Sequence, residues 1–183
     1  MTFIAIDTAS RGVAVCVAAS AEGTLLESVV VEGKSVSVVL PRALRQLLPH
    51  QPDAIVVVHG PGSYTGVRAG MAAAIGVCSA AGLRLHTAGS LEVVAALASS
   101  SGGVALRDAG RGGVYVAELL SPARVRRVPA PAEGFGLPAF SVEALSIPGV
   151  TVLDHAGALA RAVRRALQRN PVALEGAAAV QVS

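Results

Sequence analysis

The sequence has few aromatic residues and only two cysteines. Aromatic side chains make up 3% of the 183 residues, and there is no Trp, so the platforms on which single-stranded RNA bases stack are missing. Cys16 and Cys78 lie inside apolar runs typical of a strand and of a helix. This placement favours two buried free thiols over a disulfide or a metal-binding pair.

Long hydrophobic runs are also missing, although hydrophobic residues make up 52% of the chain. The longest uncharged helical run, residues 69–83, has 15 residues, whereas a membrane-spanning helix needs about 20. The N-terminus begins with a strand-like segment and lacks the basic region of a signal peptide. We therefore expect a cytoplasmic protein with no membrane segment, of a size that suits one compact core.

Motifs of metal catalysis are absent from the sequence. Four histidines, at positions 50, 59, 86 and 155, have no spacing that would place two of them on one metal ion. No nucleophile and base can be paired from the sequence either. We therefore expect a protein that is not an enzyme.

Residues 60–70 are the most informative segment present. They read Gly-Pro-Gly-Ser-Tyr-Thr-Gly-Val-Arg-Ala-Gly, after the apolar run 54–58 and before a proline-free helical segment at 67–81. The spacing excludes a P-loop, a dinucleotide-binding fingerprint and a nucleophile elbow. Two interpretations stay open: a tight structural turn with Ser63 or Thr65 as helix cap, or a binding loop at a helix N-terminus.

The pattern of apolar and turn residues runs through two similar halves. We predict a first half at 1–100, which carries the glycine-rich motif, and a shorter second half at 101–183. Strands are expected at 3–7, 13–19, 24–31, 54–59, 85–87, 103–107, 114–120 and 150–153, helices at 36–48, 67–81, 91–98 and 158–169, and an irregular loop with an edge strand at 122–138. This order predicts a pseudo-duplicated α/β fold.

The positive charge is concentrated in the second half. Residues 1–100 hold six basic and six acidic side chains, whereas residues 101–183 hold nine arginines and six acids. The arginines form two clusters, one at 124, 126 and 127 and the other at 161, 164, 165 and 169. Two interpretations stay open, contact with RNA phosphates or a solvated helix face, and the scarcity of aromatic residues favours the second.

The whole string at 60–70 resembles the signature of the TsaB (YeaZ) family, proteins of bacterial tRNA threonylcarbamoyladenosine synthesis. Other segments resemble landmarks of the same family in the same order, and the resemblance covers about residues 3–120. They are Phe3-Ile4-Ala5-Ile6-Asp7-Thr8, Leu40-Pro41 with Leu44, Ser90-Leu91-Glu92, Asp108-Ala109 and Val114-Tyr115. The resemblance implies the actin-like, Hsp70-like and sugar-kinase-like ATPase (ribonuclease H-like) fold, in two pseudo-duplicated halves of which the second is reduced.

In that superfamily two hairpin loops bind phosphates and an aspartate works with Mg²⁺. The resemblance therefore gives five candidate nucleotide-binding residues: Asp7, Thr8, Ser10, Asp108 and Gly110. The first hairpin lacks a glycine close behind its aspartate, which makes close approach to a phosphate less easy. We expect no tightly bound cofactor and no metal; weak binding of ATP or Mg²⁺, mainly in a complex with a partner, stays open.

Small residues recur at four-residue spacing along the predicted helix 67–81. One row is Gly66, Gly70 and Ala74, a second is Ala69 and Ala73, and a third is Ala72, Gly76 and Ala80. Such rows let another helix approach closely; packing on the chain's own sheet is the alternative. We expect an exposed partner-binding patch made of Gly66, Arg68, Ala69, Gly70, Ala73, Gly76, Val77 and Ala80, with Leu40 and Leu44 of the first helix.

The resemblance implies a non-catalytic scaffold subunit. It would pair with TsaD in threonylcarbamoyl transfer to the adenosine beside the tRNA anticodon, contact TsaE through that pair, meet tRNA indirectly and form a homodimer when alone. Lys34-Ser35, Gly113 and the ending at 171–175 depart from the family pattern. The alternative is an enzyme of the same fold, a glycoprotease-like peptidase or a weak ATPase.

Overall fold

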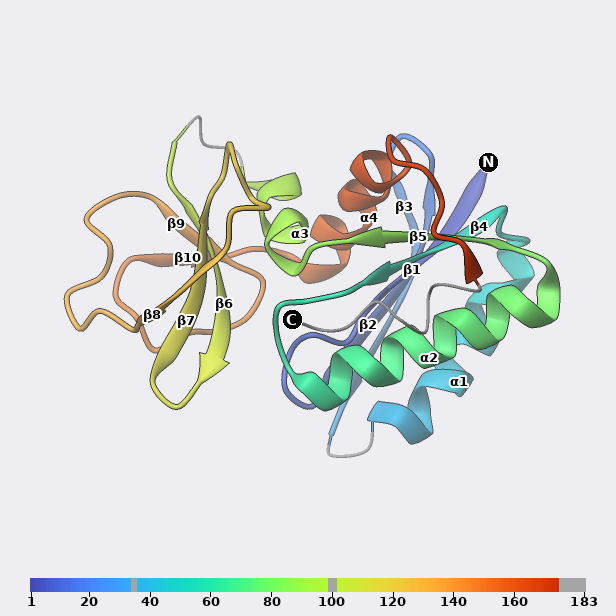
Figure 1. The fold of residues 1–183 in the computed structure, drawn as a ribbon, viewed down its shortest axis with the longest axis horizontal. Helices are drawn as coiled ribbons and strands as arrows, with labels where there is room; N and C mark the ends of the chain where they lie inside the picture. The colour runs from blue at the N-terminus through green and yellow to red at the C-terminus, as the bar shows by residue number, and fades with distance from the viewer. Residues whose placement is uncertain (34–35, 99–101, 175–183) are drawn as a thin grey trace.

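In a computed structural model of the chain, residues 1–33, 36–98 and 102–174 are described. Five strands build a first sheet in the order β3-β2-β1-β4-β5, on the right in Figure 1. β1 is antiparallel to β2 and parallel to β4, and β5 is parallel to β4. The strands are β1 (Thr2–Asp7), β2 (Val13–Ser20), β3 (Leu25–Glu32), β4 (Ala54–Val58) and β5 (Arg84–Ala88).

A second sheet repeats this topology. Its order is β10-β9-β6-β7-β8, with β6 antiparallel to β7 and parallel to β9. The strands are β6 (Val104–Gly110), β7 (Gly113–Glu118), β8 (Arg126–Pro129), β9 (Ala139–Ser141) and β10 (Val150–Val152). β6 to β10 therefore correspond one by one to β1 to β5, which confirms the predicted pseudo-duplicated α/β fold.

Four α-helices and a 3-10 turn, Leu48–His50, complete the secondary structure of the described residues. α1 (Val36–Leu47) and α2 (Tyr64–Ala81) lie on one face of the first sheet, and α3 (Ser90–Leu97) and α4 (His155–Ala166) lie on the other side (Figure 1). α4 follows the second sheet in sequence but packs on the first, and α3 contacts both α4 and β6. Loops replace α1 and α2 in the second half, which makes this half the smaller one.

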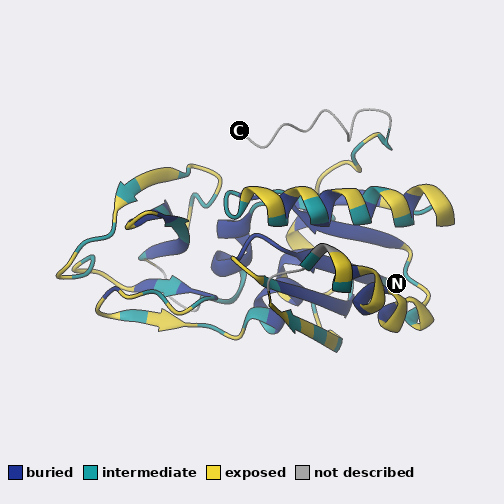
Figure 2. Ribbon diagram, turned by 90° about the horizontal axis from the view of Figure 1, so that it is seen from below, coloured by how far each residue is buried: buried dark blue, intermediate teal, exposed yellow. Residues whose placement is uncertain are grey.

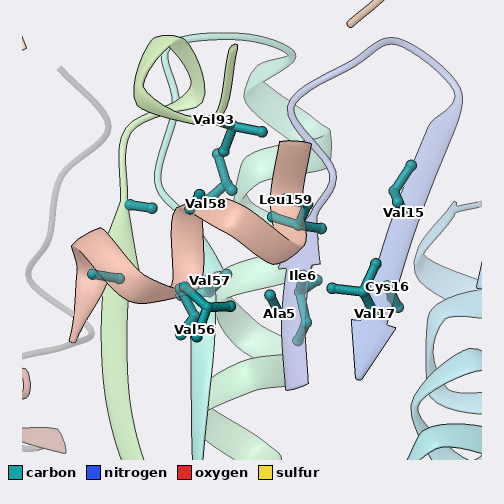
Figure 3. Close-up of a cluster of buried hydrophobic side chains, with 14 of the residues drawn as sticks. Ala5, Ile6, Val15, Cys16, Val17, Val56, Val57, Val58, Val93 and Leu159 are labelled. Carbon is teal, nitrogen blue, oxygen red and sulfur yellow. The ribbon is translucent and has the colours of Figure 1, made fainter. Parts of the chain in front are cut away.

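The main core lies around the first sheet. β4 is apolar and buried along its whole length, as expected for a central strand with helices on both faces. Figure 3 shows Leu159 of α4 in the same cluster as Ile6, Val15 and Val58. A separate, smaller cluster of Val104, Leu106, Val116 and Ala139 supports the second sheet.

The structure confirms the predicted elements and shifts some of their ends. α2 begins at Tyr64 because the Ser63 hydroxyl caps it, and α4 begins at His155 because the Asp154 carboxylate accepts hydrogen bonds from two backbone N–H groups of its first turn. β9 was not predicted, because its sequence, Ala-Phe-Ser, lacks the β-branched residues that indicated the equally short β10, Val-Thr-Val. Among the described residues, no helix combines the length and the apolar character needed to cross a membrane. The predicted boundary at residue 100 and the Lys34-Ser35 departure lie outside the described residues.

Candidate functional site

The glycine-rich loop is fastened to two other parts of the first half. The Ser63 backbone N–H donates to Ala9 O at 2.7 Å, which ties the loop to the β1–β2 hairpin. At the start of α3, the Ser90 N–H donates to Gly60 O at 2.9 Å and the Ser90 hydroxyl donates to Pro61 O at 2.6 Å. The loop is therefore a junction of strand, hairpin and helix.

Three glycines of the motif allow this close packing. A Cβ on Gly66 would overlap the backbone oxygen of Thr8, a Cβ on Gly70 would overlap the Thr8 hydroxyl, and one on Gly62 would overlap Ala9 O. The Thr8 hydroxyl donates to Gly66 O at 2.7 Å. The residue types of the motif thus follow from contact with the hairpin, which favours the structural interpretation of the turn.

The rows of small residues on α2 face different surroundings. Gly70 and Ala74 are buried against the core, with Gly66 against Thr8, whereas Ala69, Ala73 and Val77 are half-buried. The third row is exposed: it runs from Tyr64 through Arg68 and continues along the outer side of the longest helix in Figure 2. Its members, four residues apart, are Tyr64, Arg68, Ala72, Gly76 and Ala80.

The exposed patch in the structure is therefore smaller than the patch predicted from the sequence. Leu40 and Leu44 of α1 are 1% and 3% exposed and pack in the core, so their assignment to an exposed patch was wrong. Gly66 and Gly70 likewise face the chain's own hairpin. The exposed row, which we call the α2 row, is Tyr64, Arg68, Ala72, Gly76 and Ala80. Arg68 Nη1 donates to the Tyr64 hydroxyl at 2.6 Å, and Arg68 Cζ lies 5.1 Å from the centre of the Tyr64 ring, which holds both side chains in place.

Two equivalent aspartates face each other across the two sheets. Asp7 ends β1 and accepts from the N–H of Ala9, two residues on, at 2.8 Å; Asp108 in β6 accepts from the N–H of Gly110 in the same way at 2.8 Å. Each carboxylate is paired with an arginine of the opposite half. Arg107 Nη2 lies 3.2 Å from Asp7 Oδ2, and Arg11 Nε lies 3.3 Å from Asp108 Oδ2.

The Asp7 pair is buried and has further partners. His155 Nε2, at the start of α4, lies 2.9 Å from Asp7 Oδ2, and Arg107 Nε lies 3.7 Å from Glu143 Oε1. Burial alone would raise the pKa of Asp7, but the charge of Arg107 and the hydrogen bond with His155 outweigh it and hold this pKa below its ordinary value. Asp7 is therefore a carboxylate whose charge is already compensated. We call these four residues, Asp7, Arg107, Glu143 and His155, the cross-sheet cluster.

A pocket of about 640 Å³ opens beside the cross-sheet cluster, between the two sheets. Ser10 and Arg11 of the first hairpin, Val30 of β3, and Glu143 and Ile147 of the loop after β9 contribute to its lining. The Ser10 hydroxyl is buried and has no hydrogen-bond partner among the described residues. Asp7 does not line this pocket.

The residues present do not fit the magnesium nucleotide that the fold family implies. A magnesium site needs carboxylate oxygens that are free to bind it, but both aspartates are paired with arginines, and the Arg11 guanidinium fills the space over Gly110. Thr8, a further candidate, is fully buried and turned towards Gly66. The structure therefore brings Asp7, Ser10, Asp108 and Gly110 near one another but does not leave them arranged for phosphate binding.

Sequence reasoning missed Arg107, Arg11, Glu143 and His155 as partners of the two aspartates. A signal was available for Arg107, because an arginine inside an apolar strand needs a buried partner. Gly113, noted as a departure from the family pattern, has a packing role: a Cβ there would lie 2.8 Å from the Arg127 guanidinium, which donates to Gly110 O. Among the described residues, no group of three His, Cys, Asp or Glu side chains could hold a metal ion.

Comparisons with known proteins identify a family for this chain. Residues 34–135 match the family model described as TsaD, tRNA N6-adenosine threonylcarbamoyltransferase. YeaZ from Pseudomonas aeruginosa has the same fold, with 22% identity, a TM-score of 0.71 and coverage of 96% of this chain and 97% of that chain. A second structure, described as an uncharacterised protein similar to the peptidase YeaZ from Pseudomonas aeruginosa, has 22% identity, a TM-score of 0.69 and 95% coverage of both chains. No curated protein matches the sequence.

The likeness in fold extends beyond residues 3–120, the part that the sequence motifs cover. It includes the reduced second half and nearly the full length of the Pseudomonas YeaZ chain. The match to the family model and the likeness in fold together confirm the predicted resemblance to the TsaB (YeaZ) family.

Proposed function

Because the chain belongs to the tRNA N6-adenosine threonylcarbamoyltransferase (TsaD) family, we propose that it acts as a TsaB-type scaffold subunit that pairs with TsaD. In this role it would support threonylcarbamoyl transfer to the adenosine beside the tRNA anticodon without performing the chemistry. TsaE would join through the pair, tRNA would be met mainly through TsaD, and the chain would form a homodimer when alone. The cytoplasm is the proposed location.

The observation that carries this proposal is the α2 row. Gly76 lies inside a helix of 18 residues, where glycine costs about 1 kcal/mol relative to alanine. Among the residues that the structure describes, none lies within 4 Å of where its Cβ would be, so their packing does not require glycine there. A second helix packed against Ala72, Gly76 and Ala80 does require small residues, because their backbones must come close.

A role without catalysis is supported by the cross-sheet cluster. In an ATPase of this fold the two hairpin aspartates would face a magnesium nucleotide, whereas here arginines of the opposite halves hold them. Ion pairs thus join the two halves at the place where a nucleotide would otherwise bind. The alternatives, a weak ATPase and a glycoprotease-like peptidase, would need these groups to be free or a nucleophile to be activated beside them.

A transfer assay tests the proposal. TsaD, TsaE, a threonylcarbamoyl donor and unmodified tRNA are incubated with and without the chain, and the modified adenosine is measured. We expect product only when TsaD and the chain are both present, and no product from the chain without TsaD. Transfer at the same rate in the absence of the chain, or ATP or peptide hydrolysis by the chain alone that Asp7→Asn abolishes, would contradict the scaffold role.

A matched pair of variants places the contact. Ala72→Glu introduces a charge into the α2 row, whereas Ala132→Glu introduces the same charge at an exposed alanine in the loop after β8. We expect the first to abolish stimulation of TsaD, because a buried unpaired charge costs several kcal/mol, and the second to leave it unchanged.

A further inference from the structure

α4 presents a row of arginines to solvent on the side opposite to its core face. Leu159 and Val163 are fully buried, whereas Arg161 is exposed and is followed three and four residues later by the exposed Arg164 and Arg165. Side chains at this spacing share one side of a helix. None of the three forms an ion pair among the described residues, in contrast to the paired arginines at positions 11, 107 and 169.

Two hollows meet at this row. One, of about 750 Å³, lies between α4 and the β2–β3 turn at Glu22 to Leu25; the other, of about 640 Å³, lies between α4 and the loop after β7. Arg165 and Gln168 line both, so they form one continuous groove across α4. Arg124, from the other basic cluster of the sequence, lines its far end. We call this feature the arginine groove.

The carboxylates of the arginine groove are mostly engaged elsewhere. Asp154 accepts the N–H groups of Ala156 and Gly157 as the cap of α4. Glu92 is paired with Arg169 and accepts the Gly89 N–H. Glu22 is the remaining carboxylate among the described residues that line the groove; the hydrogen bond with Ser20 lowers its pKa most, and the charge of Arg164 lowers it least. With Glu92 and Arg169 paired, the lining keeps the four arginines 124, 161, 164 and 165 against two carboxylates, Glu22 and Asp154, so the groove has an excess of positive charge.

The β2–β3 turn fixes the width of the groove. A Cβ on Gly23, whose φ is +86°, would lie 2.9 Å from the Cα of Arg161, so the turn rests directly on α4. The arginines are thus carried by a helix whose position is fixed by its contact with the β2–β3 turn. A planar guanidinium suits the two oxygens of a phosphate, and several in one row suit a polymer of phosphates.

We propose that the arginine groove binds the phosphate backbone of a double-helical RNA stem, which on the proposed function is a stem of the tRNA being modified. The described residues that line the two hollows include no aromatic side chain, so they offer no platform on which unpaired bases could stack. The groove fits a stem read by shape and charge rather than by sequence. The contact positions RNA beside the transferase and takes no part in the reaction.

The test uses a fluorescein-labelled, unmodified tRNA transcript and measures anisotropy at several salt concentrations, with the chain alone and with its TsaD complex. The variant is Arg161→Ala/Arg164→Ala/Arg165→Ala. The control, Arg45→Ala/Arg84→Ala/Arg111→Ala, removes the same charge from exposed positions outside the groove. The slope of log K against log salt is negative. We expect the variant to reduce its magnitude by about one for each arginine that contacts a phosphate. The control should keep the slope of the unaltered chain.

Equal slopes for variant and control would overturn the proposal. A variant that no longer binds TsaD but still binds tRNA as the unaltered chain does would also overturn it. The groove would then be a contact with an acidic protein surface. A variant that pairs normally with TsaD but loses tRNA affinity supports it. If the chain does not pair with TsaD and the groove variant still lowers the salt slope, the scaffold role fails and the groove assignment stands.

Discussion

Asp7 and Arg107, one hundred positions apart in the chain, form a buried ion pair that joins the first strand of one half to the first strand of the other. Nη2 of Arg107 lies 3.2 Å from Oδ2 of Asp7, and both side chains are at most 1% exposed. The equivalent aspartate of the second half, Asp108, is paired in turn with Arg11 of the first. The two halves therefore hold each other by reciprocal ion pairs, of which one is buried and one is exposed.

The difference in burial gives the first prediction. Arg107→Met leaves the Asp7 carboxylate buried with one partner fewer, so we expect it to lower the free energy of unfolding by about 3–5 kcal/mol. Arg11→Met removes an arginine whose side chain is 69% exposed, and it should cost less than about 1 kcal/mol. Urea unfolding followed by circular dichroism measures both. Equal losses would show that the buried pair does not join the halves.

The second prediction concerns acid. The folded-state pKa of Asp7 lies below its ordinary value because Arg107 and His155 outweigh the opposing effect of burial. The stability that Asp7 contributes is therefore present above its unfolded-state pKa of about 3.9 and is lost as pH falls further. The difference in unfolding free energy between the unaltered chain and Asp7→Asn should accordingly be large at pH 6 and shrink towards pH 2. A difference that stays constant with pH would contradict this assignment.

The third prediction separates two glycines of the same helix. Gly70→Ala places a methyl group against the Thr8 hydroxyl and should destabilise the fold. Gly76→Ala meets none of the residues that the structure describes and should stabilise the fold by about 0.5–1 kcal/mol. Thermal unfolding measures both changes. If the α2 row is an interface, the more stable Gly76→Ala variant should also bind TsaD less tightly. Stabilisation with unchanged binding would place the interface elsewhere.

The fourth prediction concerns the thiols. Both cysteines are free and fully buried, as the sequence indicated. Burial, together with the negative charge of Asp7, raises the pKa of Cys16 to about 12, and burial raises the pKa of Cys78 to about 11. Since the thiolate is the reactive form, neither should react with a disulfide reagent in the folded protein, and both should react in urea. Rapid labelling of the folded chain would show that one of these positions opens to solvent.

Much of the fold could be predicted because its signals are local. The apolar run of β4, the Ser63 cap and the glycine-rich loop each mark an element from neighbouring residues alone. The repeat of one strand order in two sheets followed from the restart of the pattern after residue 100. The three residues of β9 gave no signal, since their strand is defined by partners far away in the chain.

The site was harder to predict because its contacts are distant in sequence. Thr8 packs against the row of α2 that contains Gly66 and Gly70. The sequence does not show this contact, so both glycines were wrongly assigned to the exposed patch. The resemblance assigned Asp7 to nucleotide binding, but the arginine that pairs with it lies one hundred residues away in the chain. A helical pattern shows that Leu40 and Leu44 share one face of α1; it does not show whether the chain's own sheet or a partner covers that face.

The most direct test of the account is the state of association of Ala72→Glu. Ala72 is exposed, unlike the half-buried Ala73, so the added charge should leave the fold intact. Light scattering measures the mass of the unaltered chain, Ala72→Glu and Ala132→Glu, each alone and mixed with TsaD, and circular dichroism checks folding. We predict a homodimer and a TsaD complex for the unaltered chain and for Ala132→Glu, and a folded monomer that does not bind TsaD for Ala72→Glu. A folded Ala72→Glu chain that still dimerises and still binds TsaD would contradict the account.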